Sequence, residues 1–377
     1  MKIRLGVPGG IMPPFDKVIQ QAQRAEARGY DSAWWPCHLM GWHPRSIWTP
    51  DITPLANFQK SADVYFDPVP AIAAAGAATK KIRMGTGVTD IVRRNPAMLA
   101  QSALTLDHIT GGRFILGLGA GEACNVTPYG LSFEKAVSKL EEGIQIIRAL
   151  WASRSEPVNF DGQFWKLKDA VLGLEPFEGK TPPIWLASHG PRALGITGRL
   201  ADGWLPTRMT PAEYRTKLDV IHAAARAAGR DPAAFEAGML AYVIVDEDRN
   251  VVRKLLDHIL VKGLCLLLPA ELFERFGAEP PFGKESSGFH DYIPSRVPRA
   301  DAERIMNRVP REVTEYYTLN GTPEDVAQQV RELAAAGLQH IVLWNITAFA
   351  DPARAKSSFQ GLDRVKELLD GSGVSAS

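Results

Sequence analysis

At 377 residues, with 45% apolar and 23% charged side chains, the chain is long enough to bury one large core or two ordinary ones. Its 43 Lys and Arg nearly balance its 42 Asp and Glu, so no strong field draws it to nucleic acid, and a small molecule is the expected partner. The widely spaced Cys37, Cys124 and Cys265 argue against a disulfide framework or a metal cluster. Without a long apolar run, we expect a cytoplasmic protein with no integral membrane segment.

Short apolar runs rich in Val, Ile, Leu and Trp recur along the chain, and most precede a segment of helical periodicity. This alternation is typical of parallel βαβ units. The eight predicted strands cover residues 3–7, 32–35, 82–88, 114–118, 184–187, 203–205, 239–245 and 340–344. Because no linker interrupts these units, we predict an α/β fold of the (β/α)8 TIM-barrel type, as one domain over residues 1–377, rather than a doubly wound sheet with a second domain.

Capping signals delimit several of the helices between these strands. A helical segment over 16–28 ends at Gly29, and Asn95 precedes a segment that opens with Pro96. Thr322 precedes another that stops at Gly337. Asn or Thr before a first-turn proline, and glycine after the last turn, predict helix ends at these positions.

Three inserts exceed the minimal repeat, at residues 38–66, 157–168 and 269–298. The second predicts a hairpin with its turn at Asp161-Gly162. Long loops after barrel strands lie on the C-terminal face, where such enzymes keep their sites, so we expect all three to shape a substrate pocket. Dimer contacts are the alternative. The aromatic residues of the third insert predict an apolar groove, unless they pack the loop onto the barrel: Phe273, Phe276, Phe282, Phe289 and Tyr292.

The end of the second predicted strand carries a candidate acid or base. His38 follows this strand, beside Cys37 and close to Trp42, where a barrel places a proton-transfer group next to a stacking aromatic ring. Leu39 and Met40 would exclude water there. A lone histidine is more often structural, and the position at a strand end beside a long aromatic loop is what favours catalysis.

The run from Gly117 to Glu122 follows the fourth predicted strand. It is not a dinucleotide-binding fingerprint, because Glu122 stands where the third glycine belongs and residues 123–130 are predicted to be a loop. We expect these glycines, like Gly85 and Gly87, to let the backbone approach a flat ring, with Glu122 delivered at the barrel mouth. The alternative is a turn of small residues with a solvated Glu.

The segment from Ser188 to Arg192 leads from the fifth strand into a helix that begins near Pro191. Free N–H groups and the helix dipole make such a start a predicted phosphate site. Thr207 and Arg208, after the sixth strand, would add a hydroxyl and a charge. A helix cap with a surface arginine is the alternative.

Several of these segments together resemble the coenzyme F420-dependent branch of the bacterial luciferase-like superfamily. They are AWWPCH at 33–38, GTGVTD at 85–90, RNPA at 94–97, GLGAGEACN at 117–125, ASHG at 187–190 and ADGW at 201–204. Within the branch, the stretches VTDIVRRNPAMLAQ, EACNVTPYG and ASHGPRALGITGR are most similar to phthiodiolone ketoreductases.

The resemblance implies a barrel, usually a homodimer, with the deazaflavin F420 across its C-terminal mouth and a non-prolyl cis peptide at Gly87-Val88. It implies that His38 is the active-site histidine, Trp42 the shielding aromatic residue and Glu122 an acid near the ring. The cofactor contacts that we predict are Cys37, Gly87, Val88, Thr89, Asp90, Gly121, Asn125, Ser188, His189, Gly190, Pro191, Thr207 and Arg208.

The sequence departs from the branch in two places. Cys37 replaces the usual Asp, which would orient the imidazole of His38. No lysine follows Thr207 to hold a sugar phosphate, so glucose 6-phosphate is a poor candidate substrate. We therefore expect hydride transfer between F420 and a carbonyl or alcohol carbon, with a lipid-like ketone favoured. The alternatives are an FMN-dependent monooxygenase and a non-catalytic deazaflavin-binding protein.

Overall fold

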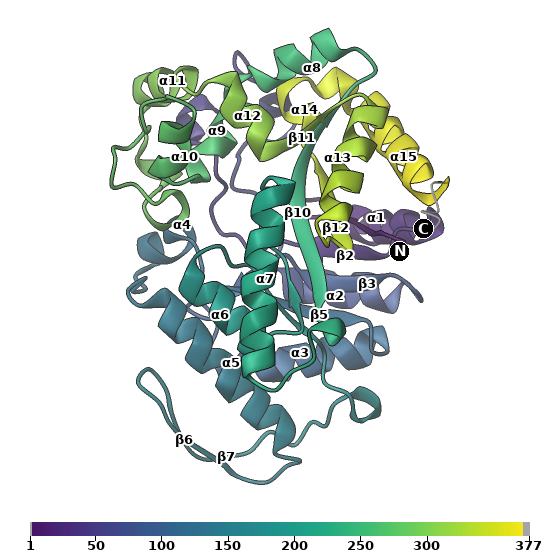
Figure 1. The fold of residues 1–377 in the computed structure, drawn as a ribbon, viewed down its shortest axis with the longest axis vertical. Coiled ribbons are helices and arrows are strands. Elements are labelled where there is room, and N and C mark those ends of the chain that lie inside the picture. The colour runs from purple at the N-terminus through teal and green to yellow at the C-terminus, as the bar shows by residue number, and fades with distance from the viewer. Residues whose placement is uncertain (1, 372–377) are drawn as a thin grey trace.

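The computed structural model describes residues 2–371, within which eight parallel strands close into a barrel surrounded by helices (Figure 1). The ring closes because β12 pairs with β1 and β10 pairs with both β12 and β9. Each predicted run overlaps one barrel strand, which confirms the predicted fold class. The barrel strands are β1 (Arg4–Pro8), β2 (Ser32–Trp35), β3 (Arg83–Thr86), β5 (Phe114–Gly119), β8 (Ile184–Leu186), β9 (Gly203–Trp204), β10 (Glu236–Val245) and β12 (His340–Asn345).

The outer layer consists of helices that begin and end at the predicted capping residues. Asn95 accepts a hydrogen bond from the backbone N–H of Ala97, and Thr322 forms a capping box. Gly29 and Gly337 have φ of +72° and +108°, the left-handed region that favours glycine. The helices are α1 (Asp16–Ala27), α2 (Pro68–Ala77), α3 (Pro96–Thr110), α5 (Ala136–Ala152), α6 (Pro191–Leu200), α7 (Pro211–Ala227), α13 (Pro323–Ala335) and α15 (Ala355–Gly371).

Tryptophans from facing strands fill the inside of the barrel. The rings of Trp34 and Trp185 are both fully buried, with centroids 5.2 Å apart. A Cβ at Gly85 would lie 2.5 Å from the Trp34 ring, and one at Gly87 would lie 3.1 Å from the Trp34 Cβ. Gly85 therefore makes room for the protein's own indole, and the prediction that it makes room for a cofactor is wrong, whereas Gly87 also lines the cavity described below. Burial of each indole stabilises the fold by roughly 4–6 kcal/mol.

A polar network joins the first residues of several strands at the opposite end of the barrel, which we call the base. Glu236 accepts from Arg4 at 2.6 Å and from Arg83 at 2.9 Å, and it pairs with His340 Nδ1 at 2.9 Å. The other ring nitrogen of His340 lies 2.7 Å from the Ser32 hydroxyl. Buried charges are tolerated when each is paired in this way, so the network holds the strand starts together.

Two short strands extend the sheet beyond the barrel. β4 (Thr89–Asp90) pairs with β5, and β11 (Thr318–Gly321) pairs with the last residues of β10. Neither was predicted, because both are short and β11 contains Asn-Gly, which is typical of a turn. The helices of the late inserts gather at this end of β10 (Figure 1); they are α8 (Arg249–Leu256), α9 (Ile259–Leu264), α10 (Ala270–Arg275), α11 (Arg299–Asn307), α12 (Arg311–Tyr317) and α14 (Thr347–Ala350).

The predicted hairpin at 157–168 is present but lies at the wrong end of the barrel to shape a pocket. Its strands, β6 (Val158–Asp161) and β7 (Lys166–Ala170), project from the base (Figure 1). Glu142 of α5 anchors the turn by accepting backbone N–H groups from residues 163, 164 and 165 at 2.8 Å each. The hairpin follows a helix rather than a strand, and the chain at that point has returned to the N-terminal face.

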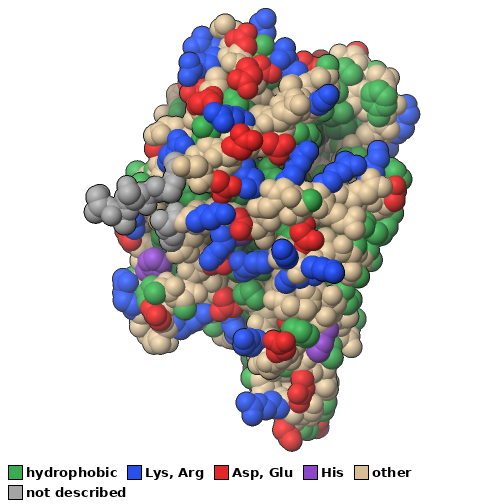
Figure 2. Space-filling model, turned by 90° about the vertical axis from the view of Figure 1, so that its right-hand side faces the viewer, with side chains coloured by type: hydrophobic (Ala, Val, Ile, Leu, Met, Phe, Trp, Pro, Cys, Tyr) green, Lys and Arg blue, Asp and Glu red, His purple; other side chains and the backbone are tan. Residues whose placement is uncertain are grey.

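The surface has no region of one dominant sign on the face that Figure 2 displays. Lys and Arg side chains alternate there with Asp and Glu, in keeping with a formal net charge of +1. Within residues 2–371, none of the helices combines the length and the apolar composition that crossing a membrane requires.

Candidate active site

A cavity of about 500 Å³ opens at the C-terminal ends of the barrel strands. This position is where barrel enzymes keep their active sites. Every predicted site residue except Arg208 lines it. Its other lining residues are Arg93, Gly119, Ala120, Val137, Ala187, Arg192, Ala193, Leu205, Leu240, Tyr242, Phe289 and His290.

The predicted catalytic residues converge on one side of the cavity. Asn125 Nδ2 lies 2.9 Å from His38 Nδ1 and donates to Glu122 Oε2 at 3.0 Å. Trp42 Nε1 donates to the same carboxylate oxygen at 3.1 Å, and its ring stands edge-on to the imidazole with centroids 4.9 Å apart. Among the described residues, His38 Nε2 has no hydrogen-bond partner. The cluster therefore leaves one ring nitrogen of His38 available in a site that is lined by both polar and apolar groups.

The electrostatics of the cluster keep the imidazole neutral. Burial lowers the pKa of His38, whose side chain is only 7% exposed, and the nearby Glu122 opposes this shift without reversing it. Arg93 adds to the lowering. Near neutral pH the group can donate or accept one hydrogen bond at Nε2, but it does not carry a positive charge.

A buried ion pair holds the backbone just before His38. Arg93 donates to Asp90 Oδ2 and to the carbonyl oxygen of Cys37. The other oxygen of Asp90 accepts the N–H groups of Val92 and Arg93 at 3.0 and 2.8 Å. Both carboxylate oxygens of Asp90 are thus hydrogen-bonded within the protein. Asp90 lines the cavity, as a cofactor contact would, but its carboxylate is already used by Val92 and Arg93. Arg93 thereby holds the backbone carbonyl of Cys37, the residue that precedes His38.

The start of α6 forms the other side of the cavity. Its N-cap is Gly190, so no side chain caps the first-turn N–H groups. The hydroxyl of Thr197 donates to the Ala193 carbonyl, which leaves Ser188 to donate its own proton to Thr197 at 2.8 Å. The Ser188 hydroxyl proton is therefore already used inside the protein. An anion at this helix start would be held by backbone N–H groups together with Thr207, which lines the cavity beside His189.

The cavity fits a flat tricyclic cofactor with a phosphate tail. Small residues, Gly119 to Gly121 and Ala187, line one wall, and the buried hydroxyl of Thr89 has no hydrogen-bond partner among residues 2–371. The peptide between Gly87 and Val88 is cis, as the family resemblance implies. A Cβ at Gly119 would lie 3.0 Å from Val88 Cγ2, so this glycine accommodates the Val88 side chain at the same wall.

Several expectations about the site are corrected. Arg208 does not line the cavity, because its guanidinium turns back to the carbonyl of its neighbour Met209. Of the five aromatic residues in the third insert, only Phe289 lines the cavity; Phe273, for example, is fully buried in a cluster that the insert shares with the barrel. Residues 123–126 form a turn of helix, α4 (Ala123–Val126), rather than a loop. Leu39 is 51% exposed and does not close the site.

Three neighbours of the catalytic cluster were not predicted. The Tyr65 ring lies 5.2 Å from His38, and the Tyr242 ring lies 5.9 Å from Trp42. His290 packs against Phe133 at 5.5 Å, which brings the third insert to the rim. Only Tyr242 could have been predicted from the sequence. It lies two residues after Leu240 in an apolar strand, and because side chains alternate along a strand, both point to the same face, the inside of the barrel.

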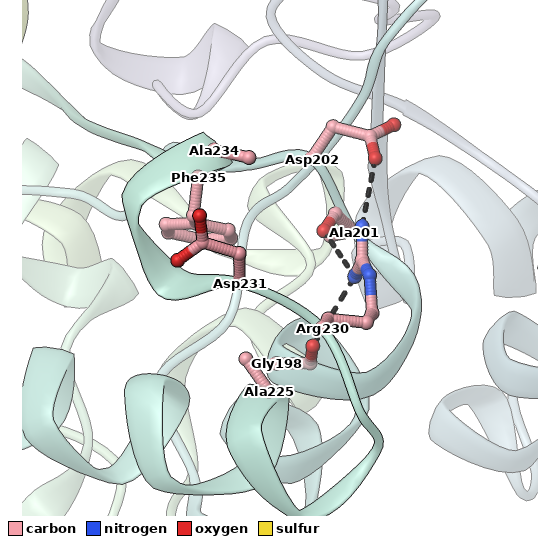
Figure 3. Close-up of a pocket in the computed structure, with 8 residues that line it drawn as sticks. All are labelled: Gly198, Ala201, Asp202, Ala225, Arg230, Asp231, Ala234 and Phe235. Carbon is pink, nitrogen blue, oxygen red and sulfur yellow. Dashed lines mark hydrogen bonds and ion pairs between the residues drawn. The ribbon is translucent and has the colours of Figure 1, made fainter.

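A second depression, of about 260 Å³, lies at the base between α6, α7 and the start of β10 (Figure 3). Its arginine is fully used by the fold: Arg230 donates to the carbonyl oxygens of Gly198 and Ala201 and to Asp202 at 3.2, 2.5 and 2.8 Å. The carbonyls belong to the last turn of α6, so Arg230 caps that helix. This depression therefore has no free donor comparable to His38.

Comparison with known proteins identifies the family of the chain. The model of the luciferase-like monooxygenase family matches residues 2–340. A phthiodiolone/phenolphthiodiolone dimycocerosates ketoreductase of Mycobacterium kansasii is 37% identical over 91% of this chain and 94% of its own. A 5,10-methylenetetrahydromethanopterin reductase of Archaeoglobus fulgidus is 29% identical over 70% of this chain and 77% of its own.

Among solved structures, an F420-dependent secondary alcohol dehydrogenase with an F420-acetone adduct superimposes with a TM-score of 0.72. It covers 97% of this chain and 99% of its own at 22% identity, which supports the shared fold. The resemblance inferred from the sequence motifs is confirmed, and the chain belongs to the luciferase-like monooxygenase family.

Proposed function

We propose that this protein is a coenzyme F420-dependent oxidoreductase that transfers a hydride between the deazaflavin and a carbonyl or alcohol carbon. The observation that carries the proposal is the His38, Glu122, Asn125 and Trp42 cluster at the cavity, opposite a wall of small residues and an uncapped helix start. The ketoreductase and reductase names of the relatives support the same reaction class.

The residues that would hold the cofactor lie on both sides of this cavity. The backbone from Gly87 to Thr89 and from Gly119 to Gly121 would support the ring system, and the start of α6 with Thr207 would hold the phosphate. When bound, the deazaflavin supplies or accepts the hydride.

The protein's own part in the reaction is to orient, to exclude water and to handle the charge on the substrate oxygen. His38 Nε2 is the available group for that oxygen, while Trp42 and Tyr242 give the cavity an aromatic wall. Glu122 lines the cavity with a side chain that is 21% exposed, and its carboxylate is held in place by Trp42 and Asn125.

A ketone with an apolar chain is the substrate class that we propose. Val88, Leu205, Leu240 and Phe289 give the cavity an apolar lining next to the polar cluster. Several relatives are named phthiodiolone/phenolphthiodiolone dimycocerosates ketoreductase, which supports a ketone as the substrate. Homodimer formation and a cytoplasmic location stay predictions, and size-exclusion chromatography with light scattering would test the first.

The first experiment is a fluorescence titration of the purified protein with F420 and, separately, with FMN. We expect micromolar binding of F420, followed by reduction of a panel of ketones of increasing chain length with reduced F420. Tight binding of FMN alone, with consumption of O2, would place the protein with the monooxygenases and overturn the proposal. Binding of F420 without turnover of any ketone or alcohol would leave a deazaflavin-binding protein.

A further inference from the structure

We propose that Asn125 fixes His38 in the neutral tautomer with its proton on Nε2, so that His38 meets a substrate oxygen as a hydrogen-bond donor. The tautomer follows from this chain's own contacts. The role toward substrate rests on the function proposed above.

The orientation of the Asn125 amide is determined by two backbone donors. The N–H groups of Leu39 and Met40 lie 2.7 and 2.9 Å from Asn125 Oδ1. A backbone N–H can only donate, so the atom that receives both must be the oxygen. The NH2 group of this fully buried amide therefore faces the opposite way, toward His38 and Glu122.

The position of the NH2 group decides the protonation of the imidazole. Asn125 Nδ2 has two hydrogens, and its two nearest acceptors are His38 Nδ1 at 2.9 Å and Glu122 Oε2 at 3.0 Å. A hydrogen on His38 Nδ1 would point into the same space as the amide hydrogens. Nδ1 must accordingly accept, and a neutral imidazole then carries its proton on Nε2, toward the cavity.

Asn125 is thus a positioning residue, acting through His38. Its oxygen holds the backbone after His38, and its nitrogen selects the tautomer of the ring. A neutral N–H donor stabilises a substrate oxygen that gains negative charge during hydride transfer to a carbonyl carbon. The alkoxide then takes its proton from solvent water as the product leaves the cavity.

The competing arrangement has the proton on Nδ1. The charged groups that face the ring are Glu122, Arg93 and Asp90, and its uncharged neighbours are Trp42 and Tyr65. Glu122 Oε2, at 3.5 Å from Nδ1, and the Met40 carbonyl are the acceptors that such a proton would reach. In that arrangement Nε2 would accept a hydrogen bond and serve as a base.

The test is ¹⁵N NMR of the full-length protein labelled at its eight histidines, with His38 assigned by loss of its signal in His38→Gln. We expect His38 to show a protonated Nε2 and an unprotonated Nδ1, and to remain neutral well below pH 6.5. A protonated Nδ1 in the unmodified protein overturns the proposal. This readout needs neither cofactor nor substrate, so it stands even if F420 does not bind.

Asn125→Asp provides the second arm, with Asn250→Asp on the exposed face of α8 as the matched control. A carboxylate at position 125 can still accept the backbone N–H groups of residues 39 and 40. Its second oxygen, however, can only accept, so it favours a proton on His38 Nδ1. We expect the His38 titration midpoint to move up by about one to three pH units. The pH profile of ketone reduction should follow it. No change in the variant overturns the proposal, and Asn250→Asp should leave both readouts unchanged.

Discussion

The mouth and the base of the barrel each hold a buried histidine beside a glutamate, and only the mouth is suited to chemistry. At the base, Ser32, His340 and Glu236 are joined in the order of a serine hydrolase triad. Ser32 and His340 are, however, fully buried, and both ring nitrogens of His340 have partners. At the mouth, one nitrogen of His38 remains available beside a cavity of about 500 Å³.

The comparison shows that residue type and spacing alone do not identify a site. The base network joins the strand starts through hydrogen bonds and ion pairs, which stabilises the fold. In the mouth cluster, Nε2 of His38 is not bonded to any group of residues 2–371 and faces the cavity that the loops form at this end of the barrel. Substitutions should therefore affect stability at one end and turnover at the other.

Glu236→Ala should give the largest effect, because it leaves Arg4, Arg83 and His340 without their shared partner. We expect a loss of about 3–5 kcal/mol in the free energy of unfolding, measured by urea denaturation. The activity per folded molecule should not change. The exposed Glu247→Ala is the control, and a variant as stable as the parent would show that the base network contributes nothing.

His38→Ala should give the converse result. Removal of the His38 Nε2 group should lower kcat for ketone reduction about 10²–10³-fold. The Kd for F420 and the free energy of unfolding should stay close to the parent values. Steady-state kinetics at saturating cofactor would measure this. Near-full turnover with intact cofactor binding would remove His38 from the mechanism.

A third buried histidine, His43, should make the stability of the fold depend on pH. His43 Nε2 donates a hydrogen bond to the Leu260 carbonyl oxygen at 2.7 Å, and burial lowers the pKa of His43 to about 4. Between pH 6.5 and about 4 the unfolded chain binds a proton at this residue that the folded chain does not, so stability falls as the pH falls through this window.

His43→Phe should remove that dependence, because phenylalanine does not titrate. Unfolding titrations at several pH values should show the slope reduced by about 1.4 kcal/mol per pH unit relative to the parent. The same slope in both proteins would mean that His43 is protonated equally in the folded and unfolded states. Activity at neutral pH should be unaffected, since this residue lies outside the cavity lining.

Arg208→Ala should have the smallest effect on ligand binding. Its guanidinium is turned toward the Met209 carbonyl, away from the cavity lining, so the Kd for F420 should change by less than about twofold. The fluorescence titration described above would measure it. A tenfold loss would show that this arginine contacts the cofactor after all.

The barrel was predictable from the sequence because its signals are local. Eight apolar runs separated by capped helices specify the strand order, and Asn95 and Thr322 start helices where expected. The hairpin at 157–168 lies at the base and not at the mouth because it follows a helix. A segment after a helix lies at the N-terminal end of the barrel strands, whereas a segment after a strand lies at the C-terminal end. β11 was missed since its four residues include a turn-like Asn-Gly.

Most of the cavity lining was predictable because strand ends meet at one face. His38, Glu122 and the start of α6 needed only that rule and the family motifs. Side-chain direction was not predictable: Arg208 turns away from the cavity, and Gly85 makes room for the Trp34 ring. Tyr65 and His290 lie in long inserts without periodicity, so only the folded chain brings them to the site.

One strand joins the two ends that have been compared. β10 carries Glu236 at the base and Tyr242 at the mouth, with Leu240 between them on the same inward face. Because side chains alternate along a strand, inserting or deleting one residue in β10 would turn this whole set outward. We infer that variants of this barrel must keep the residue count from 236 to 242 unaltered, whereas the hairpin at 157–168, which lies outside the cavity lining, can change in length.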